Sequence, residues 1–113
     1  MRKKTSLASE LLPGTLEMLI LKSLSRGKAH GYAIARHLEQ TSADVLTVGE
    51  SSLYPALQRL LVNGWVTAAW GETETGRRAR FYRLTPTGRK RLAAEAAGFE
   101  RMFGAIAAIM QEG

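Results

Sequence analysis

The chain has 113 residues, with 16 Lys and Arg against 10 Asp and Glu and a formal net charge of +6 at pH 7. A hydrophobic content of 45% excludes wholesale disorder and, at this length, favours one compact domain. Because cysteine is absent, disulfides, thiolate metal sites and thiol nucleophiles are excluded. No apolar run approaches the roughly 20 residues that span a bilayer, so the sequence predicts a soluble, cytoplasmic protein. Its positive charge favours an anionic partner, either nucleic acid or a membrane surface.

Three helices are predicted in the first half of the chain, after a flexible basic arm over residues 1–10. Residues 15–25 are too apolar for a helix with a broad solvent face, so this helix should be buried. A second, amphipathic helix should begin near Gly31. Leucines at helical spacing predict a third helix that starts near residues 50–52, with Pro55 in its first turn, where no amide hydrogen bond is lost.

The second half of the chain predicts a hairpin followed by a long helix. Residues 65–70 and 80–85 are aromatic and β-branched, and the polar loop between them contains two glycines. Thr85 is a suitable N-cap, and Pro86 is suited to the first helical position. The helix should then continue to about Glu112, which makes it longer than a small domain can cover.

Apolar residues within this last helix recur at spacings of 4, 3, 4, 3 and 4. Such a stripe is typical of a seam between two helices, so it predicts a homodimer. The alternative is that the stripe packs back onto its own domain. The residues of the stripe are Leu92, Ala96, Phe99, Phe103, Ile106 and Met110.

Basic residues are concentrated from the end of the predicted loop onward: seven of the sixteen lie between Arg77 and Arg91, without any acid. Arg77 and Arg78 at a hairpin tip could follow phosphates or enter a narrow minor groove. The polar side of the third helix also carries residue types that bond base edges or phosphates. In isolation, a solvated loop and an ordinary amphipathic helix would give the same two patterns. The residues on that helix are Ser51, Ser52, Tyr54, Gln58 and Arg59.

Two short helices, a third helix with a polar outer face and a basic hairpin follow the order of a winged helix-turn-helix. The segments 11–42, 51–66 and 76–92 closely resemble the PadR family of bacterial transcriptional regulators. The resemblance implies a mainly α fold with a small β-hairpin (α+β), in which residues 11–85 bind DNA and residues 86–113 form a dimerisation helix. It also implies a homodimeric repressor whose third helix enters the major groove of double-stranded DNA.

Residue by residue, the resemblance places five side chains on the recognition helix, three on the wing and Tyr32 where the second helix crosses the DNA backbone. A half-buried packing role for Tyr32 is the alternative. Short members of the family can also bind flat aromatic effectors between the dimer helices, where Phe99 and Phe103 lie in this chain; simple dimer packing is the alternative. The predicted DNA contacts are Tyr32, Ser51, Ser52, Tyr54, Gln58, Arg59, Arg77, Arg78 and Arg80.

Other functions have less support from the sequence. An enzyme or a metal site would need converging polar groups, but His30 and His37, on one predicted helix, have no partners at ligand spacing, so no cofactor or metal is expected. A winged helix that binds another protein instead of DNA is the main alternative. A membrane-surface helix is disfavoured because three glutamates against Arg101 follow residue 91.

Overall fold

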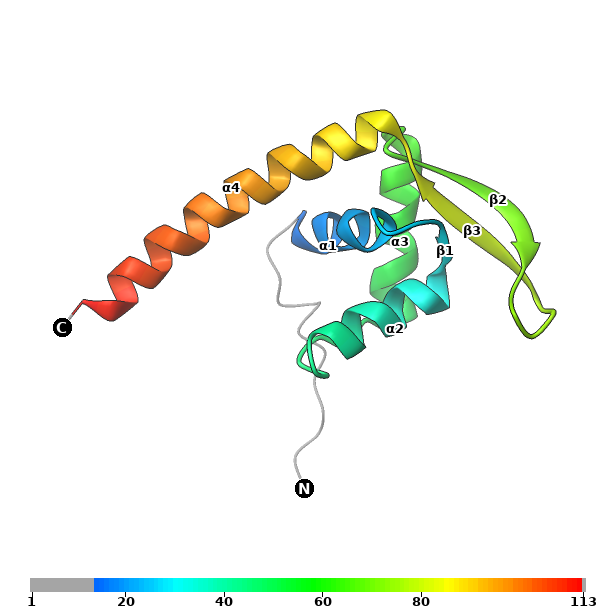
Figure 1. The fold of residues 1–113 in the computed structure, drawn as a ribbon, viewed down its shortest axis with the longest axis horizontal. Helices are drawn as coiled ribbons and strands as arrows, with labels where there is room; N and C mark the ends of the chain where they lie inside the picture. The colour runs from blue at the N-terminus through cyan, green and yellow to red at the C-terminus, as the bar shows by residue number, and fades with distance from the viewer. Residues whose placement is uncertain (1–13, 113) are drawn as a thin grey trace, which may run out of the picture.

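The computed structural model describes residues 14–112, so the predicted basic arm over residues 1–10 lies outside the described residues. Helices and a small antiparallel sheet make up the fold, which confirms the predicted class (Figure 1). The elements in chain order are α1 (Thr15–Leu24), β1 (Ala29–His30), α2 (Gly31–Thr41), α3 (Glu50–Val62), β2 (Val66–Glu72), β3 (Arg78–Leu84) and α4 (Pro86–Gln111).

The core lies where α1, α2 and α3 meet the base of the sheet. As its composition predicts, α1 is buried along most of its length, because both neighbouring helices and α4 pack against it. Tyr82 and Leu84 of β3 are 5% and 6% exposed and close this core from the sheet side. Residues with almost no exposure are Ile20, Leu21, Leu24, Ile34, Ala56, Leu57 and Leu60.

Pro55 lies deeper in α3 than the sequence predicted. The helix starts at Glu50, within the predicted range, so Pro55 is its sixth residue and lies beyond the first turn. A proline there removes the amide that would bond the carbonyl of Ser51. The carbonyl of Ser51 is left without this bond, but Ser51 is exposed, so water can reach it.

The connection between α2 and α3 is a tight turn in which Ala43 and Asp44 have φ values of 52° and 65°. Two side chains fix the turn: Ser42 Oγ accepts a bond from the Leu46 amide at 3.0 Å, and the Glu39 carboxylate accepts one from the Val48 amide at 3.3 Å. Left-handed backbone costs an alanine about 1 kcal/mol or more, so the turn is strained at Ala43.

Replacing Ala43 by glycine is expected to raise the free energy of unfolding by up to about 1 kcal/mol, because relief of this strain exceeds the added entropy of the unfolded chain. Urea unfolding measures the change. Ala94→Gly in the regular, exposed part of α4 is the matched control and should lower stability by about 0.5 to 1 kcal/mol. Equal losses in both variants would contradict strain at Ala43.

The sheet has the order β1-β3-β2, with both pairings antiparallel. The sequence did not predict β1, which is only two residues long and pairs Ala29 with Tyr82 and His30 with Phe81. The hairpin strands also extend further than predicted, so Arg78 lies in β3 opposite Glu72 and not at the tip. We call β2, β3 and the turn over residues 73–77 the wing.

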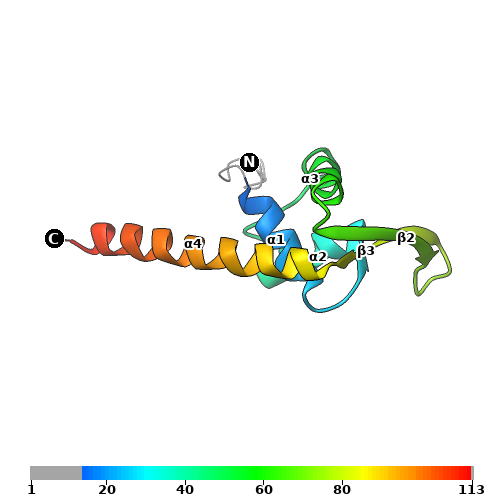
Figure 2. The same ribbon diagram turned by 90° about the horizontal axis from the view of Figure 1, so that it is seen from above.

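The wing and α4 leave the helical body in opposite directions (Figure 2). Helix α4 has 26 residues, and its first turns pack on α1 while its remainder extends beyond the core. Within residues 14–112, no helix combines the length and the apolar character that crossing a membrane requires.

Candidate nucleic-acid interface

Helix α3 presents an exposed face, which carries polar side chains, directly opposite its core face. Its buried residues are Leu53, Ala56, Leu57 and Leu60. Successive residues of a helix are turned by about 100°, so the side of α3 opposite this stripe starts at Ser51 and recurs every three to four residues. Gln58 lies on this side. Both side chains are exposed. The centre of the outward face therefore consists of Ser51, Pro55, Gln58 and Val62.

Arg59 lies on one flank of this face, beside α1. Its Nε donates a hydrogen bond to the Glu17 carboxylate at 2.6 Å, and this bond raises the pKa of the guanidinium above its ordinary value. Ser52 lies on the same flank, because it is seven residues before Arg59 and thus two helical turns away. The structure thus separates these two predicted contacts from the centre of the face.

Tyr54 lies on the opposite flank, where it joins α3 to the start of α2. A side chain at Gly31 would place its Cβ 2.8 Å from the Tyr54 hydroxyl, so only glycine lets the ring pack this closely. Tyr32, which follows Gly31, is 69% exposed, so the half-buried packing considered for it is wrong; the side chains of α2 that pack in the core are Ile34 and Leu38.

The two histidines do not share a helix, because His30 precedes α2 as its N-cap. Its Nδ1 accepts a hydrogen bond from the Ala33 amide at 3.3 Å, and its ring lies edge-on to Phe81 at 5.3 Å. His37, within α2, is bonded to Arg26 Nη1 at 2.6 Å. Both rings therefore serve local structure.

The three predicted arginines of the wing are exposed, with Arg77 in the turn and Arg78 and Arg80 on β3. An open groove of about 1130 Å³ separates the wing from the start of α2. Burial raises the pKa of the Tyr82 hydroxyl in this groove, and although the Arg80 cation lowers it, the net change is upward. Side chains that line the groove include Lys28, Tyr32, Tyr54, Trp70, Arg78 and Arg80.

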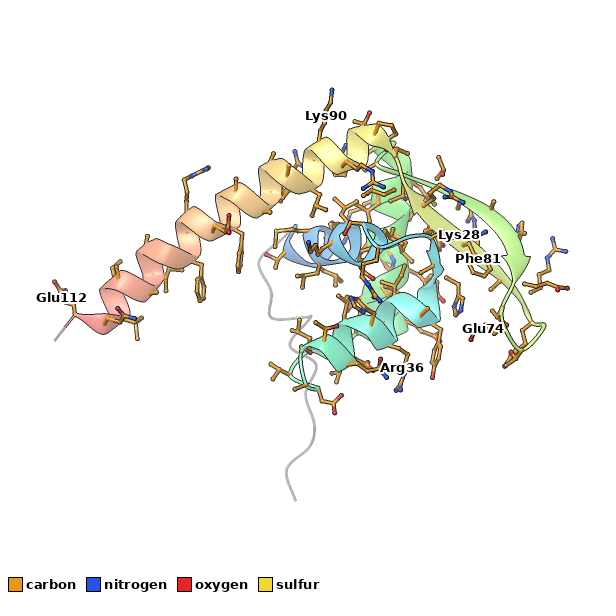
Figure 3. The ribbon with its side chains drawn as sticks, viewed as in Figure 1. Lys28, Arg36, Glu74, Phe81, Lys90 and Glu112 are labelled. Atoms are coloured by element: carbon orange, nitrogen blue, oxygen red, sulfur yellow. The ribbon has the colours of Figure 1, made fainter. Side chains whose placement is uncertain are left out.

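Sequence reasoning missed Lys28 and Trp70 as parts of this surface. Lys28 Nζ lies 5.4 Å from the centre of the Phe81 ring, a cation–π contact made across the β1–β3 pairing (Figure 3). Because β1 was not predicted, no sequence signal connected Lys28 with the wing. Trp70 was treated only as a strand residue, although an exposed tryptophan is itself a signal of a binding surface.

The apolar stripe of α4 divides into two parts. Leu92 packs against the core and Ala96 is half-buried, so only the first part of the stripe packs back onto its own domain. Phe99 and Phe103, whose rings stack at 5.9 Å, lie in the exposed part. Two further exposed residues, Met102 and Ile109, widen the stripe beyond the predicted seam. We call the exposed part the apolar face of α4; it consists of Phe99, Met102, Phe103, Ile106, Ile109 and Met110.

A helix with an exposed outer face, set against a second helix and followed by an arginine-bearing wing, defines the winged helix-turn-helix class of fold. The Transcriptional regulator PadR-like family matches residues 20–94, and the chain belongs to this family. The family consists of transcriptional regulators and not of enzymes, which confirms the interpretation of the sequence that disfavoured an enzyme.

Solved structures and a transposon protein resemble the chain. A transcriptional regulator from Clostridium thermocellum is 30% identical, with 84% of this chain and 92% of that chain covered and a TM-score of 0.77. A PadR-like regulator from Bacillus cereus, 22% identical, has the same fold, with 92% and 99% covered and a TM-score of 0.79. A 37.1 kDa protein of transposon TN4556 from Streptomyces fradiae is 41% identical over 90 residues, 80% of this chain but only 24% of that protein.

Proposed function

We propose that the chain is a homodimeric, cytoplasmic repressor that binds a two-fold operator, with α3 in the major groove and the wing on the flanking DNA backbone. In this assignment residues 11–85 form the DNA-binding part, and residues 86–113 the dimerisation helix. One observation carries the proposal: Tyr54, on the flank of the exposed face of α3, and the exposed arginines Arg78 and Arg80 of β3 border the same open groove.

The outward face of α3 suits the major groove in chemistry. Gln58, at its centre, can bond adenine through two hydrogen bonds, and Ser51 near the helix start adds a hydroxyl beside free backbone amides that favour phosphate. Tyr32 and Tyr54 border the groove and can donate their hydroxyls to phosphates. Ser52 and Arg59 are assigned to the edge of the contact, where Arg59 remains paired with Glu17.

The apolar face of α4 supports the dimer. Its exposed aromatic and aliphatic side chains continue the line of Leu92 and Ala96 beyond the core, as a helix does when a second copy covers it. A two-fold dimer presents two α3 helices to DNA, so half-sites should lie about 34 to 36 Å apart, or a multiple of this distance.

The stacked pair Phe99 and Phe103 also offers a flat surface to an aromatic effector. In the proposed dimer two such pairs would face the same seam. Effector binding stays a prediction, and simple packing of the two rings in the dimer is its alternative.

Fluorescence anisotropy tests the proposed function. The purified protein is titrated with the DNA upstream of its own gene and with a scrambled duplex, at two salt concentrations. Preference for the native fragment at about 0.15 M salt, by several kcal/mol, is the expected result. Equal and steeply salt-dependent binding would show only the electrostatic contribution. Absence of binding would favour the protein-adaptor alternative, with the apolar face of α4 as its partner surface.

Arg77→Ala combined with Arg78→Ala is expected to weaken binding similarly on all sequences and to reduce the salt slope by about two units, because each arginine displaces one counterion from the DNA. The slope is the change in the logarithm of the binding constant with the logarithm of salt concentration. Arg101→Glu removes the same net charge on the side of α4 away from its apolar face and serves as the control. An identical slope in the wing variant and the wild type would remove the wing from the interface.

A further inference from the structure

One face of the wing changes character along its length. The antiparallel register places Val66 with Leu84 and Ala68 with Tyr82 on the face toward the core, and Trp70 continues that face outward. Val66 is 2% exposed, whereas Trp70 is 63% exposed. The face that closes the core at the base of the wing thus becomes a solvent-exposed surface near the tip.

Aromatic rings and guanidinium groups lie next to one another along this face of the wing. The Arg80 guanidinium lies 6.0 Å from the centre of the Tyr82 ring, and Arg78 lies 4.9 Å from the centre of the Trp70 ring. Trp70 is also the direct cross-strand partner of Arg80. We call these four residues the aromatic–arginine row; from the core outward it consists of Tyr82, then the cross-strand pair of Arg80 and Trp70, and then Arg78.

The inner end of the row meets the recognition helix. Tyr54 of α3 and Tyr82 of β3 both line the groove beside α2. The row therefore begins at the flank of the proposed major-groove face and runs toward the wing tip. A duplex bound to α3 would pass this row with its phosphates.

The Arg78 guanidinium packs on an aromatic ring although an acidic residue lies opposite it on β2. Glu72 is its direct cross-strand neighbour, yet the guanidinium lies over the Trp70 ring, one diagonal position away. Stacking uses the flat face of the guanidinium and leaves the N–H donors at its edge available to a phosphate. An arginine without such a stacking contact would lose side-chain entropy when it binds a phosphate, whereas a stacked arginine has already lost part of that entropy.

We infer that Trp70 is a positioning residue for DNA binding: its ring holds the stacked guanidinium of Arg78 beside its cross-strand partner Arg80, so that both arginines keep their donors available to the phosphate backbone beside the recognition helix. The inference rests on the proposed function, because it assigns a role within that DNA interface. It adds a residue that contributes no charge and whose effect on binding passes through the two arginines.

Binding by Trp70 variants gives the first test. Trp70→Leu is expected to weaken operator binding about tenfold and to reduce the salt slope by about one unit, since the cation–π contact that holds Arg78 is lost. Trp70→Phe keeps a ring and should stay within about threefold of the wild type. Because Trp70 is largely exposed, the melting temperature of both variants should match the wild type. A merely structural residue would alter the melting temperature and leave the salt slope unchanged.

A double-mutant comparison shows whether Trp70 acts through the arginines. In the background Arg78→Ala with Arg80→Ala, Trp70→Leu is expected to change affinity by less than about twofold. The same tenfold loss in this background would overturn the inference, as would wild-type affinity and salt slope in Trp70→Leu alone.

Tryptophan fluorescence gives an independent readout. The chain has two tryptophans, so Trp65→Phe leaves Trp70 as the single emitter. Its emission should change on addition of duplex DNA, with the same midpoint as the anisotropy titration. Unchanged emission at saturating DNA would overturn the inference while leaving the proposed function intact. Failure of the wild-type protein to bind any duplex would overturn both.

Discussion

Replacing Gly88 by alanine is expected to lower the free energy of unfolding by about 3 kcal/mol or more, and the melting temperature by about 10 °C or more. A Cβ at Gly88 would lie 2.0 Å from the carbonyl oxygen of Trp65 and 2.9 Å from Leu84 Cδ1. The first neighbour is backbone, so the clash cannot be relieved by a side-chain rotation.

The backbone around Gly88 is also held by hydrogen bonds that oppose any movement. The Trp65 carbonyl accepts a bond from the Thr85 amide at 3.1 Å. The Thr85 hydroxyl donates to the Gly64 carbonyl at 2.8 Å and accepts from the Gly88 amide at 2.9 Å. Moving α4 away from Trp65 would therefore break the helix cap and its link to the start of the wing together.

Gly98→Ala is the matched control, since Gly98 lies on the same helix and its Cβ would find only Arg101 Nη2, at 3.8 Å. This variant should gain up to about 1 kcal/mol, because alanine favours the helix over glycine. Thermal unfolding followed by circular dichroism measures both variants. A melting temperature for Gly88→Ala equal to that of the wild type would contradict the close packing of α4 on the Trp65 carbonyl.

Local signals in the sequence predicted the helices well. Thr85 with Pro86 begins α4 where the capping pattern placed it. Each of these signals acts within a few residues of its own position. Their physical cause is contained in one short segment, so one sequence is enough to find them.

Features that join distant segments could not be predicted in this way. Strand β1 exists because Ala29 and His30 meet β3, and Arg59 is held by Glu17 from another helix. Neither pairing has a signal in the spacing along the chain. The predicted position of Arg78 was wrong for a related reason. The composition of this segment is typical of a hairpin tip, but Arg78 pairs with Glu72 and so extends the strand.

The candidate site was predicted in its residue types but not in its organisation. The polar side of α3 was identified, yet only the structure separates Ser51 and Gln58 at its centre from Arg59 at its flank. On α4, the alternating spacing of three and four residues between apolar positions likewise predicted only a narrow seam. That pattern omits Met102 and Ile109, which lie beside it on the exposed helix and belong to the same apolar face.

Phe103→Glu is expected to raise the dimer dissociation constant by at least about a hundredfold, since a two-fold interface would then hold two unpaired carboxylates in an apolar seam. Phe103 is 61% exposed in the single chain, so the monomer should keep its fold. Light scattering measures the oligomeric state, and circular dichroism checks the helix content.

Loss of the dimer should also lower operator affinity by about two to four orders of magnitude. Each α3 then binds its half-site alone, without the high effective concentration that a tethered second helix supplies. Ala108→Glu adds the same charge on the side of α4 away from the apolar face and should leave dimerisation and operator binding near the wild type. If Phe103→Glu stayed dimeric while this control behaved as expected, the apolar face of α4 would not be the dimer seam, and its exposed side chains would need a different partner.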